Sequence, residues 1–392
     1  MTWNFDTDCR YHTQDTSYYC GAATAMMVLA EIGVPYTSLD QDDLYTSNHN
    51  HNIKAGWATD PYGLRYTLID RKPASFTNTF LVYKPEAEDE GTRKIVYTLW
   101  RYGVSPVVLV YGCMHWIVVR GVQTDVEPTS GASYAVEGLW INNPVFLDNE
   151  PHSASDACGS GGVNGVENQW VSYATWQSTY FTGCNYDSAT GSDQFISVCD
   201  PDEPKIELPK RIAMERPFDG RKIIDPETAI QMVYEGMEQN HLTKDEQIAE
   251  RLRRLKFEEP MLVKRLDLPD SYYYLSPAIA DGEVYGYGQV DGRYGELQSV
   301  YLMDGKAKPY EMNRKVVVKR LMTRTFELPK EMGRFHLRPD TFCLAPTLVW
   351  RPCRESYSPH LPFWQLNTGN QTLYIRADGE VFTHLTTTGT GV

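Results

Sequence analysis

The pattern of hydrophobic and polar positions in the first hundred residues predicts two helices. Residues 21–32 are helix formers with almost no charge and are followed by Gly33, so we expect a buried helix there. Residues 92–103 place their large apolar side chains on one face, which predicts an amphipathic helix. The polar, turn-rich stretch 36–60 fits either a loop or a pair of short helices.

Strands are predicted next. Short apolar runs at 105–112 and 115–122, separated by a tight link, indicate two antiparallel neighbours. A third strand covers 138–143 and ends before Pro144, which cannot continue a central ladder. Further along, the pattern predicts a Gly-rich loop at 158–162, an aromatic helix at 171–181 and a closing strand at 194–199.

The second half of the chain begins with helix signals and continues with strand signals. Asp225 followed by Pro226 predicts the start of a helix that runs to about Gln239, and the capping box at 243–246 predicts another that reaches Leu255. Alternating runs then predict strands at 272–275, 284–290, 298–302, 373–376 and 381–385. Two helices against an antiparallel sheet are expected in this half.

Charge divides the chain at about the same place as these patterns. Residues 1–200 carry 10 Lys and Arg against 23 Asp and Glu, whereas residues 201–392 carry 27 against 28. We therefore expect an α+β protein with a first domain at 1–200, a linker at 201–224 and an α+β accessory domain at 225–392. The acidic first half argues against nucleic acid as a partner, since phosphate contacts need a basic face.

Composition is that of a globular protein, with 42% hydrophobic and 22% charged residues. No run approaches the roughly 18 to 20 apolar residues that a membrane span needs. The first residues have neither a basic start nor an apolar core, which predicts a cytoplasmic location. Eight cysteines in a chain of this length are not a disulfide scaffold, so free thiols are expected, with Cys158 and Cys184 as the most plausible bridge.

Cys20 is the first candidate for chemistry. It stands directly before the predicted buried helix, where unpaired backbone N–H groups favour a thiolate. Gln14, six residues upstream, offers a side-chain N–H to an oxyanion that forms beside the sulfur.

A thiol nucleophile also needs a base and a group that orients the base. His115 opens a predicted buried strand after a tight turn, and Asn143 ends the next strand, where its carbonyl oxygen accepts from the imidazole. Cys113 is the nearest rival nucleophile, but no helix start acidifies it, and Asn142 is the alternative to Asn143 as the orienting group.

Together, Gln14, Cys20-Gly21, the strand that begins with His115 and the run 141–144 resemble the papain-like cysteine peptidases, specifically the C39-like bacteriocin-processing branch. The resemblance covers about residues 5–200. It implies a papain-like first domain, in which the helix bearing the cysteine packs on an antiparallel sheet. The family pattern has Asp before Pro, whereas this chain has Asn143.

The predicted function is therefore a cysteine peptidase that hydrolyses peptide bonds through Cys20, His115 and Asn143, with Gln14 at the oxyanion. An acyl or amide transferase with the same triad and an inert peptide-binding module are the alternatives. No cofactor or metal is expected, since His49 and His51 lack a clear third ligand. The partner is a peptide or protein substrate.

No catalytic constellation is recognisable in the second half, which is predicted to dock a partner or to inhibit. Its aromatic residues fit either a peptide-binding surface or the core of a sheet: Tyr272, Tyr273, Tyr274, Tyr285, Tyr287 and Trp364.

Overall fold

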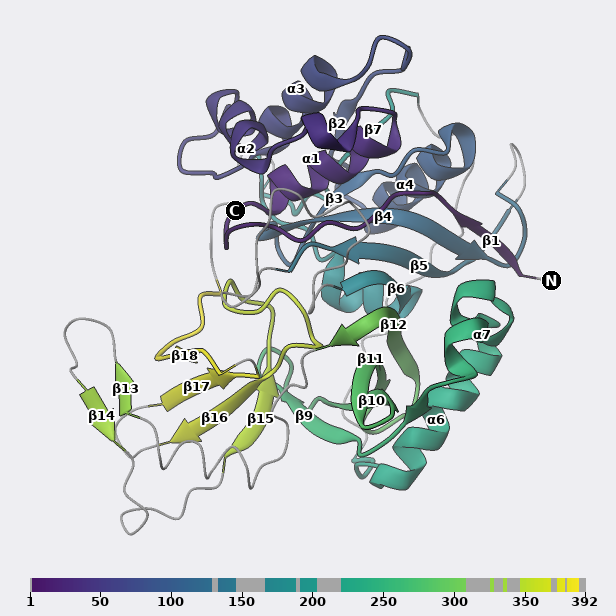
Figure 1. Ribbon diagram of the computed structural model, residues 1–392, viewed down its shortest axis with the longest axis vertical. Coiled ribbons are helices and arrows are strands. Elements are labelled where there is room, and N and C mark those ends of the chain that lie inside the picture. Colours follow the sequence, from purple (N-terminus) through teal and green to yellow (C-terminus); the bar gives the residue numbers. More distant parts are fainter. Residues whose placement is uncertain are drawn as a thin grey trace.

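One large sheet runs through both halves of the molecule (Figure 1). The computed structural model describes residues 2–128, 133–145, 166–187, 191–202, 220–307, 325–327, 334–336, 346–367, 372–377 and 379–387. Within these residues the sheet has 16 strands, and its pairings are antiparallel except for that between β9 (Met261–Arg265) and β15 (Thr347–Trp350). Together with the helices, this confirms the α+β class.

The α-helices of the described residues are α1 (Cys20–Glu31), α2 (Gln41–Asn50), α3 (Pro61–Arg71), α4 (Glu88–Tyr102), α5 (Tyr173–Thr175), α6 (Pro226–Gln239) and α7 (Glu246–Leu252). Three short helical turns of other types are η1 (Tyr36–Ser38), η2 (Trp176–Tyr180) and η3 (Leu242–Lys244).

The strands of the first half are β1 (Trp3–Asp6), β2 (Leu81–Tyr83), β3 (Val107–Val110), β4 (His115–Thr124), β5 (Val136–Asn143), β6 (Val166–Ser172) and β7 (Ser197–Cys199). The remaining strands, apart from β9 and β15, are β8 (Lys256–Phe257), β10 (Tyr272–Ala280), β11 (Glu283–Asp291), β12 (Leu297–Ala307), β13 (Thr325–Glu327), β14 (Arg334–His336), β16 (Phe363–Asn367), β17 (Thr372–Arg376) and β18 (Val381–Phe382).

Most predicted elements are present. The helices expected at 21–32 and 92–103 are α1 and α4, and the three strands expected after them are β3, β4 and β5. β3 and β4 pair antiparallel, as predicted, with Val110 opposite His115. The undecided stretch 36–60 forms η1 and α2. The Gly-rich loop at 158–162 lies outside the described residues.

Two predictions were wrong in detail, and one helix was not predicted. The expected helix at 171–181 begins later, because β6 runs through Ser172, whose side chain then caps the short α5 that leads into the π-helical η2. The capping box assigned to 243–246 is replaced by Asp245, which accepts from the Ile248 N–H at 3.2 Å ahead of α7. α3 was missed, although Asp60 accepts from two backbone N–H groups at its start and Pro61 follows.

In the second half, α6 begins at the predicted Asp225 cap, and the five predicted strands are all present. β8, β9, β13, β14, β15 and β16 were missed. The aromatic residues of this half serve mostly as core, since Tyr273, Tyr274, Tyr287 and Trp364 are buried.

The buried helix α1 lies against β4 in the core of the first half. Every residue from Cys20 to Leu29 is buried, and so are all ten residues of β4. Figure 1 shows α1, α2 and α3 together on one side of this part of the sheet. Apolar side chains on all sides of α1 explain why its sequence carries almost no charge.

The two halves are joined rather than separate. β12 pairs with β6, which places Val300 opposite Trp170 and continues the sheet from one half into the other. One hydrophobic cluster contains Trp170 together with Val233 of α6, and another contains Trp116 together with Trp350. The domain boundary near residue 200 stays a prediction, and most of the linker at 201–224 lies outside the described residues.

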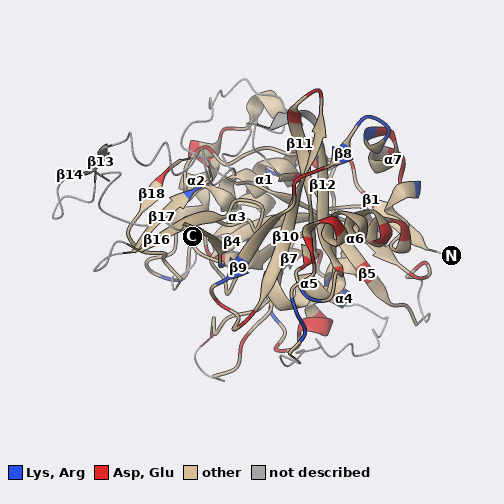
Figure 2. Ribbon diagram, turned by 90° about the horizontal axis from the view of Figure 1, so that it is seen from below, with Lys and Arg blue, Asp and Glu red and all other residues tan. Residues whose placement is uncertain are grey.

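Charged residues lie mainly at the periphery. In Figure 2 the red and blue segments mark outer helices and the ends of strands, and the central strands are tan. Among the helices of the described part of the chain, none is long and apolar enough to cross a bilayer.

Candidate active site

Cys20 is the first residue of α1 and is completely buried. The backbone N–H of Trp116 donates to its sulfur, which ties the start of the helix to β4. The following Gly21 is required by packing, because a Cβ atom there would lie 2.6 Å from the side chain of Thr59. The Cys20-Gly21 pair thus allows the start of α1 to approach its neighbours closely.

His115 follows a hairpin turn with unusual backbone geometry. Tyr111, Gly112 and Cys113 have φ angles of 55°, 65° and 66°, so three successive residues are left-handed before β4 begins at His115. Tyr111 and Gly112 are also held from outside the turn, since their N–H groups donate to residues of the 180–182 segment at 2.8 and 3.0 Å. These hydrogen bonds fix the backbone of the turn that leads into His115.

Asn143 reaches His115 because β4 and β5 are antiparallel, so that the start of one strand lies beside the end of the other. The Asn143 Oδ1 and the His115 Nε2 are 2.7 Å apart. The His115 Nδ1 is buried and has no hydrogen-bond partner among the described residues. One imidazole nitrogen is thus oriented while the other is left open.

Asn142 does not hydrogen-bond to His115 but joins neighbouring segments. Its Nδ2 donates to the Cys9 backbone oxygen at 3.0 Å, and its Oδ1 accepts from the Asn168 N–H at 2.9 Å. The register between β5 and β6 shifts between Ile141 and Asn143, which separates the two asparagines in role. Asn142 therefore joins strands, and Asn143 holds the histidine.

Gln14 is completely buried. Its Nε2 donates to the Thr16 backbone oxygen at 2.8 Å, and its Oε1 has no hydrogen-bond partner among the described residues. It lines a cavity of about 350 Å³ that also borders Tyr357. Its amide N–H is engaged locally, and its role at an oxyanion stays a prediction.

Protonation of the pair differs from the expectation of a thiolate. Burial raises the pKa of Cys20 to about 12, despite the backbone N–H groups of Trp116, Gly21 and Cys20 itself, which act to lower it. Burial also lowers the pKa of His115 to about 4, against a smaller opposing effect of its bond to Asn143. In this conformation the helix start is outweighed, and the site holds a neutral thiol and a neutral imidazole.

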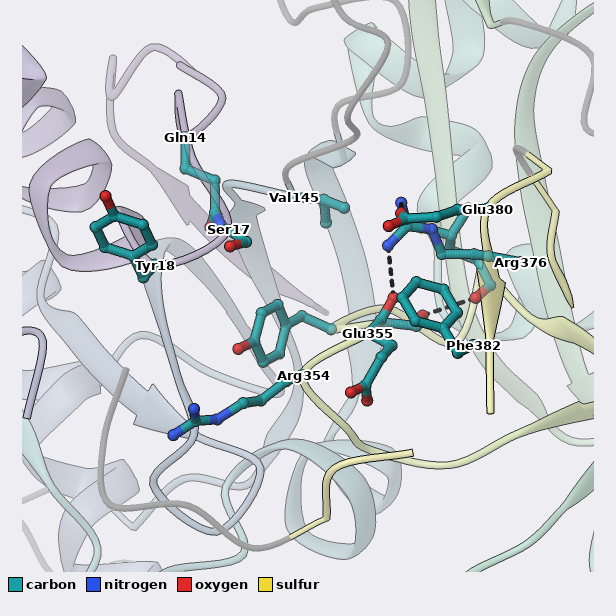
Figure 3. Close-up of a pocket in the computed structure, with 12 residues that line it drawn as sticks. Gln14, Ser17, Tyr18, Val145, Arg354, Glu355, Arg376, Glu380 and Phe382 are labelled. Atoms are coloured by element: carbon teal, nitrogen blue, oxygen red, sulfur yellow. Dashed lines mark hydrogen bonds and ion pairs between the residues drawn. The ribbon is translucent and has the colours of Figure 1, made fainter. Parts of the chain in front are cut away.

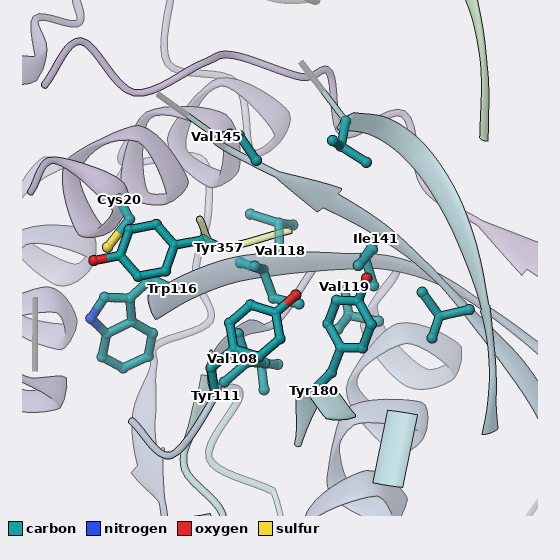
Figure 4. Packing of buried hydrophobic residues seen from close by; sticks show 14 of the residues in the cluster. Cys20, Val108, Tyr111, Trp116, Val118, Val119, Ile141, Val145, Tyr180 and Tyr357 are labelled. Carbon is teal, nitrogen blue, oxygen red and sulfur yellow. The ribbon is translucent and has the colours of Figure 1, made fainter. Parts of the chain in front are cut away.

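Tyr357 is the residue that sequence reasoning missed. It comes from the second half, between β15 and β16, yet its ring stacks on His115 with centroids 4.2 Å apart and planes 4° from parallel. Its backbone oxygen accepts from the Asn143 Nδ2 at 3.0 Å. Figure 4 shows the ring beside the Cys20 sulfur, and the pKa of Tyr357 is raised by burial first and by Cys20 second.

The cavity beside Tyr357 is formed by both halves of the chain. Gln14, Ser17 and Tyr18 of the first half line it together with Arg354 and Arg376 of the second half (Figure 3). No local pattern in the sequence pairs these two regions, since more than 300 residues separate them.

The cysteine predictions need correction. Cys113 and Cys184 form a disulfide with Cα atoms 5.7 Å apart, so Cys184 is not bonded to Cys158, which lies outside the described residues. The bond also removes Cys113 as a rival nucleophile. Cys9, Cys20, Cys199 and Cys353 are thiols, as expected.

His49 and His51 make ordinary contacts in the described structure. The His51 ring stacks on Tyr66, and the His49 Nδ1 lies 3.2 Å from the Ala58 backbone oxygen. The described residues include no group of three or more His, Cys, Asp and Glu side chains suited to a metal ion.

Comparisons with protein-family models, with curated proteins and with solved structures found no match to this chain.

Proposed function

We propose that this protein is a papain-like cysteine peptidase of the C39-like type, with Cys20 as nucleophile, His115 as base and Asn143 as the group that orients the base. One observation carries the proposal: the His115 Nε2 is held by the Asn143 Oδ1 at 2.7 Å while the buried Nδ1 is left open. A base that serves a thiol needs this division between its two nitrogens.

In the proposed reaction the Cys20 proton passes to the His115 Nδ1, and the sulfur attacks a peptide carbonyl carbon. The oxyanion takes hydrogen bonds from the Cys20 backbone N–H and from the Gln14 amide, each worth on the order of 3 kcal/mol. The C–N bond breaks, and the imidazolium gives its proton to the leaving amine. Water then hydrolyses the thioester, which releases the acid and restores the thiol.

The position of Cys20 supports this assignment. It begins a helix, and the backbone N–H of Trp116, the residue after His115, donates to its sulfur. Nucleophile and base are therefore on adjacent elements even though the intervening sequence is 94 residues long. The resemblance over residues 5–200 is consistent with the same roles.

An inert peptide-binding module is the second candidate, and the burial of both groups favours it. A thiol whose pKa is raised to about 12 is a poor nucleophile at neutral pH. This alternative predicts that the protein cleaves no peptide even in a variant whose Cys20 is rapidly alkylated.

Hydrolysis of a peptide library by the wild-type protein, compared with Cys20→Ala, tests the proposal. We expect cleavage that disappears in Cys20→Ala and falls strongly in His115→Ala, because each variant lacks one half of the proton-transfer pair. Cys199→Ala is the matched control, since it removes an equally buried thiol that lies outside the site. Equal cleavage by the wild type and Cys20→Ala contradicts the proposal.

The predicted partner is a peptide or protein substrate, and the predicted cytoplasmic location is best tested through the disulfide. Bonds such as Cys113–Cys184 persist mainly in oxidising compartments. The redox state of these two cysteines in the producing cell therefore reports on where the protein resides.

A further inference from the structure

The Cys20 sulfur cannot be reached by a substrate in the described conformation. Cys20 and His115 are both 0% exposed, and Tyr357, which covers them, is 4% exposed. A nucleophile must approach a carbonyl carbon to about 3 to 3.5 Å. Something has to move before a peptide enters.

Tyr357 packs against both members of the proposed pair, since its ring stacks on His115 and its pKa is affected by Cys20. Its ring covers the face of His115, and its backbone oxygen occupies the Asn143 amide. The buried His115 Nδ1 has no partner among the described residues. An unpaired buried nitrogen costs free energy, and water could relieve that cost if the site were open. This geometry suits a resting state rather than a working one.

The segment that carries Tyr357 is fixed on its inner side. We call residues 353–361 the cap segment. The Ser356 Oγ accepts from the Trp350 Nε1 at 3.2 Å and donates toward the Leu361 backbone oxygen at 2.7 Å. The Tyr273 hydroxyl donates to the Pro359 backbone oxygen at 2.6 Å.

Its outer side is held by polar groups, of which Arg354 is exposed and Glu355 partly exposed. The Glu355 carboxylate accepts from the Thr386 N–H at 2.8 Å and from its hydroxyl at 2.7 Å, and the Arg354 N–H donates to the Thr386 oxygen at 3.1 Å. Arg376 donates to the Glu355 backbone oxygen at 2.7 Å (Figure 3). Arg376 is itself buried, but the contacts between Glu355 and Thr386 are only partly buried. Partly exposed contacts exchange with water at little net cost, so this side is the one that can release.

We propose that the cap segment is a built-in inhibitor of the proposed site, and that the site opens when Tyr357 withdraws from His115 and Cys20. The inference rests on the proposed function. Opening would join the site to the 350 Å³ cavity that Tyr357 and Gln14 already line, which provides room for a substrate.

Opening also changes the chemistry. The shifts that keep the thiol and the imidazole neutral are caused chiefly by burial, so access of water moves both pKa values back toward each other. Uncovering therefore admits the substrate and favours the ion pair at the same time. The apparent activity of the closed form is reduced by the fraction of molecules that are open.

Iodoacetamide labelling followed by peptide mapping tests the cap independently of catalysis. We expect Cys20 to be labelled slowly in the wild type and in Tyr357→Phe, which keeps the ring, and at least about tenfold faster in Tyr357→Ala, because the covering ring is gone. Cys199 is the internal reference. It should stay slow in all three proteins, since it is buried on β7, opposite Leu81 of β2, and near Lys94 and Thr98 of α4.

Glu355→Gln provides a second route should Tyr357→Ala fail to fold, which rapid labelling of Cys199 would reveal. It weakens the outer hold on the segment and leaves the ring in place, so we expect a smaller, few-fold rise in Cys20 labelling. Rapid labelling of Cys20 in the folded wild type overturns the proposal. So does unchanged labelling in the folded variants.

Peptide hydrolysis by the same proteins separates the two proposals. Faster labelling of Cys20 in Tyr357→Ala without hydrolysis supports the cap and contradicts the peptidase. Hydrolysis that is equal in the wild type and in Tyr357→Ala supports the peptidase and overturns the cap.

Discussion

Removal of the Cys113–Cys184 disulfide tests how much this bond contributes to the stability of the protein. The bond joins residues 71 apart in sequence, and the chain-entropy relation gives about 4 kcal/mol of stabilisation for a loop of that length. Cys113 is buried, and the turn it belongs to contains three left-handed residues, so the bond also restrains backbone next to the imidazole.

Urea unfolding followed by tryptophan fluorescence would measure this effect. We expect Cys113→Ala/Cys184→Ala to lose about 4 kcal/mol of unfolding free energy relative to the oxidised wild type. Reduction of the wild type with dithiothreitol should produce a similar loss, and the double variant should not respond to the reductant. A double variant within about 1 kcal/mol of the oxidised wild type would refute the loop-entropy reasoning.

Three further predictions concern the site and its surroundings. Asn143→Ala leaves the buried His115 Nε2 and the Tyr357 backbone oxygen unpaired, so we expect a loss of about 1 to 3 kcal/mol for each group in urea unfolding. Asn143→Asp should not restore the stability, because its second oxygen cannot donate to the Tyr357 oxygen and the carboxylate would be buried. Gly21→Ala should lower the free energy of unfolding by about 1 to 3 kcal/mol, because its Cβ would lie 2.6 Å from the Thr59 side chain. A variant as stable as the wild type would show that the start of α1 can shift to accommodate the methyl group. Burial lowers the pKa of His115 to about 4 and of His360 to about 3, so the unfolded chain binds protons first, and stability present above the unfolded pKa of 6.5 is lost as the pH falls toward the folded values. The slope should be about 1.4 kcal/mol per pH unit for each histidine, and His360→Gln should remove one share of it; an unchanged slope in that variant contradicts this account.

The sequence by itself predicted the elements whose signals are local. An uncharged run predicted α1, apolar runs predicted β3, β4 and β5, and the Asp225 cap predicted α6. These succeeded because periodicity and capping act within a few residues. Detail failed where a neighbouring strand decided the outcome: β6 extends to Ser172 because it pairs with β5.

The same reasoning predicted the residues of the candidate site but not their ionisation. Cys20, His115 and Asn143 were identified from residue type and spacing, and the antiparallel register of β4 and β5 places the last two 2.7 Å apart. Whether they act in catalysis stays a prediction. The ionisation of Cys20 was predicted in the wrong direction, because the effect of a helix start is local whereas burial depends on every segment that covers the sulfur.

Three features belonged to the tertiary structure alone. Cys184 pairs with Cys113, β12 joins β6, and Tyr357 lies over the site, each across a long stretch of chain. Such contacts depend on how separate elements pack, and one sequence carries no local trace of that packing. The sequence thus determined where a thiol, an imidazole and an amide stand in the chain, and only the folded structure decided that a tyrosine from the other half covers them.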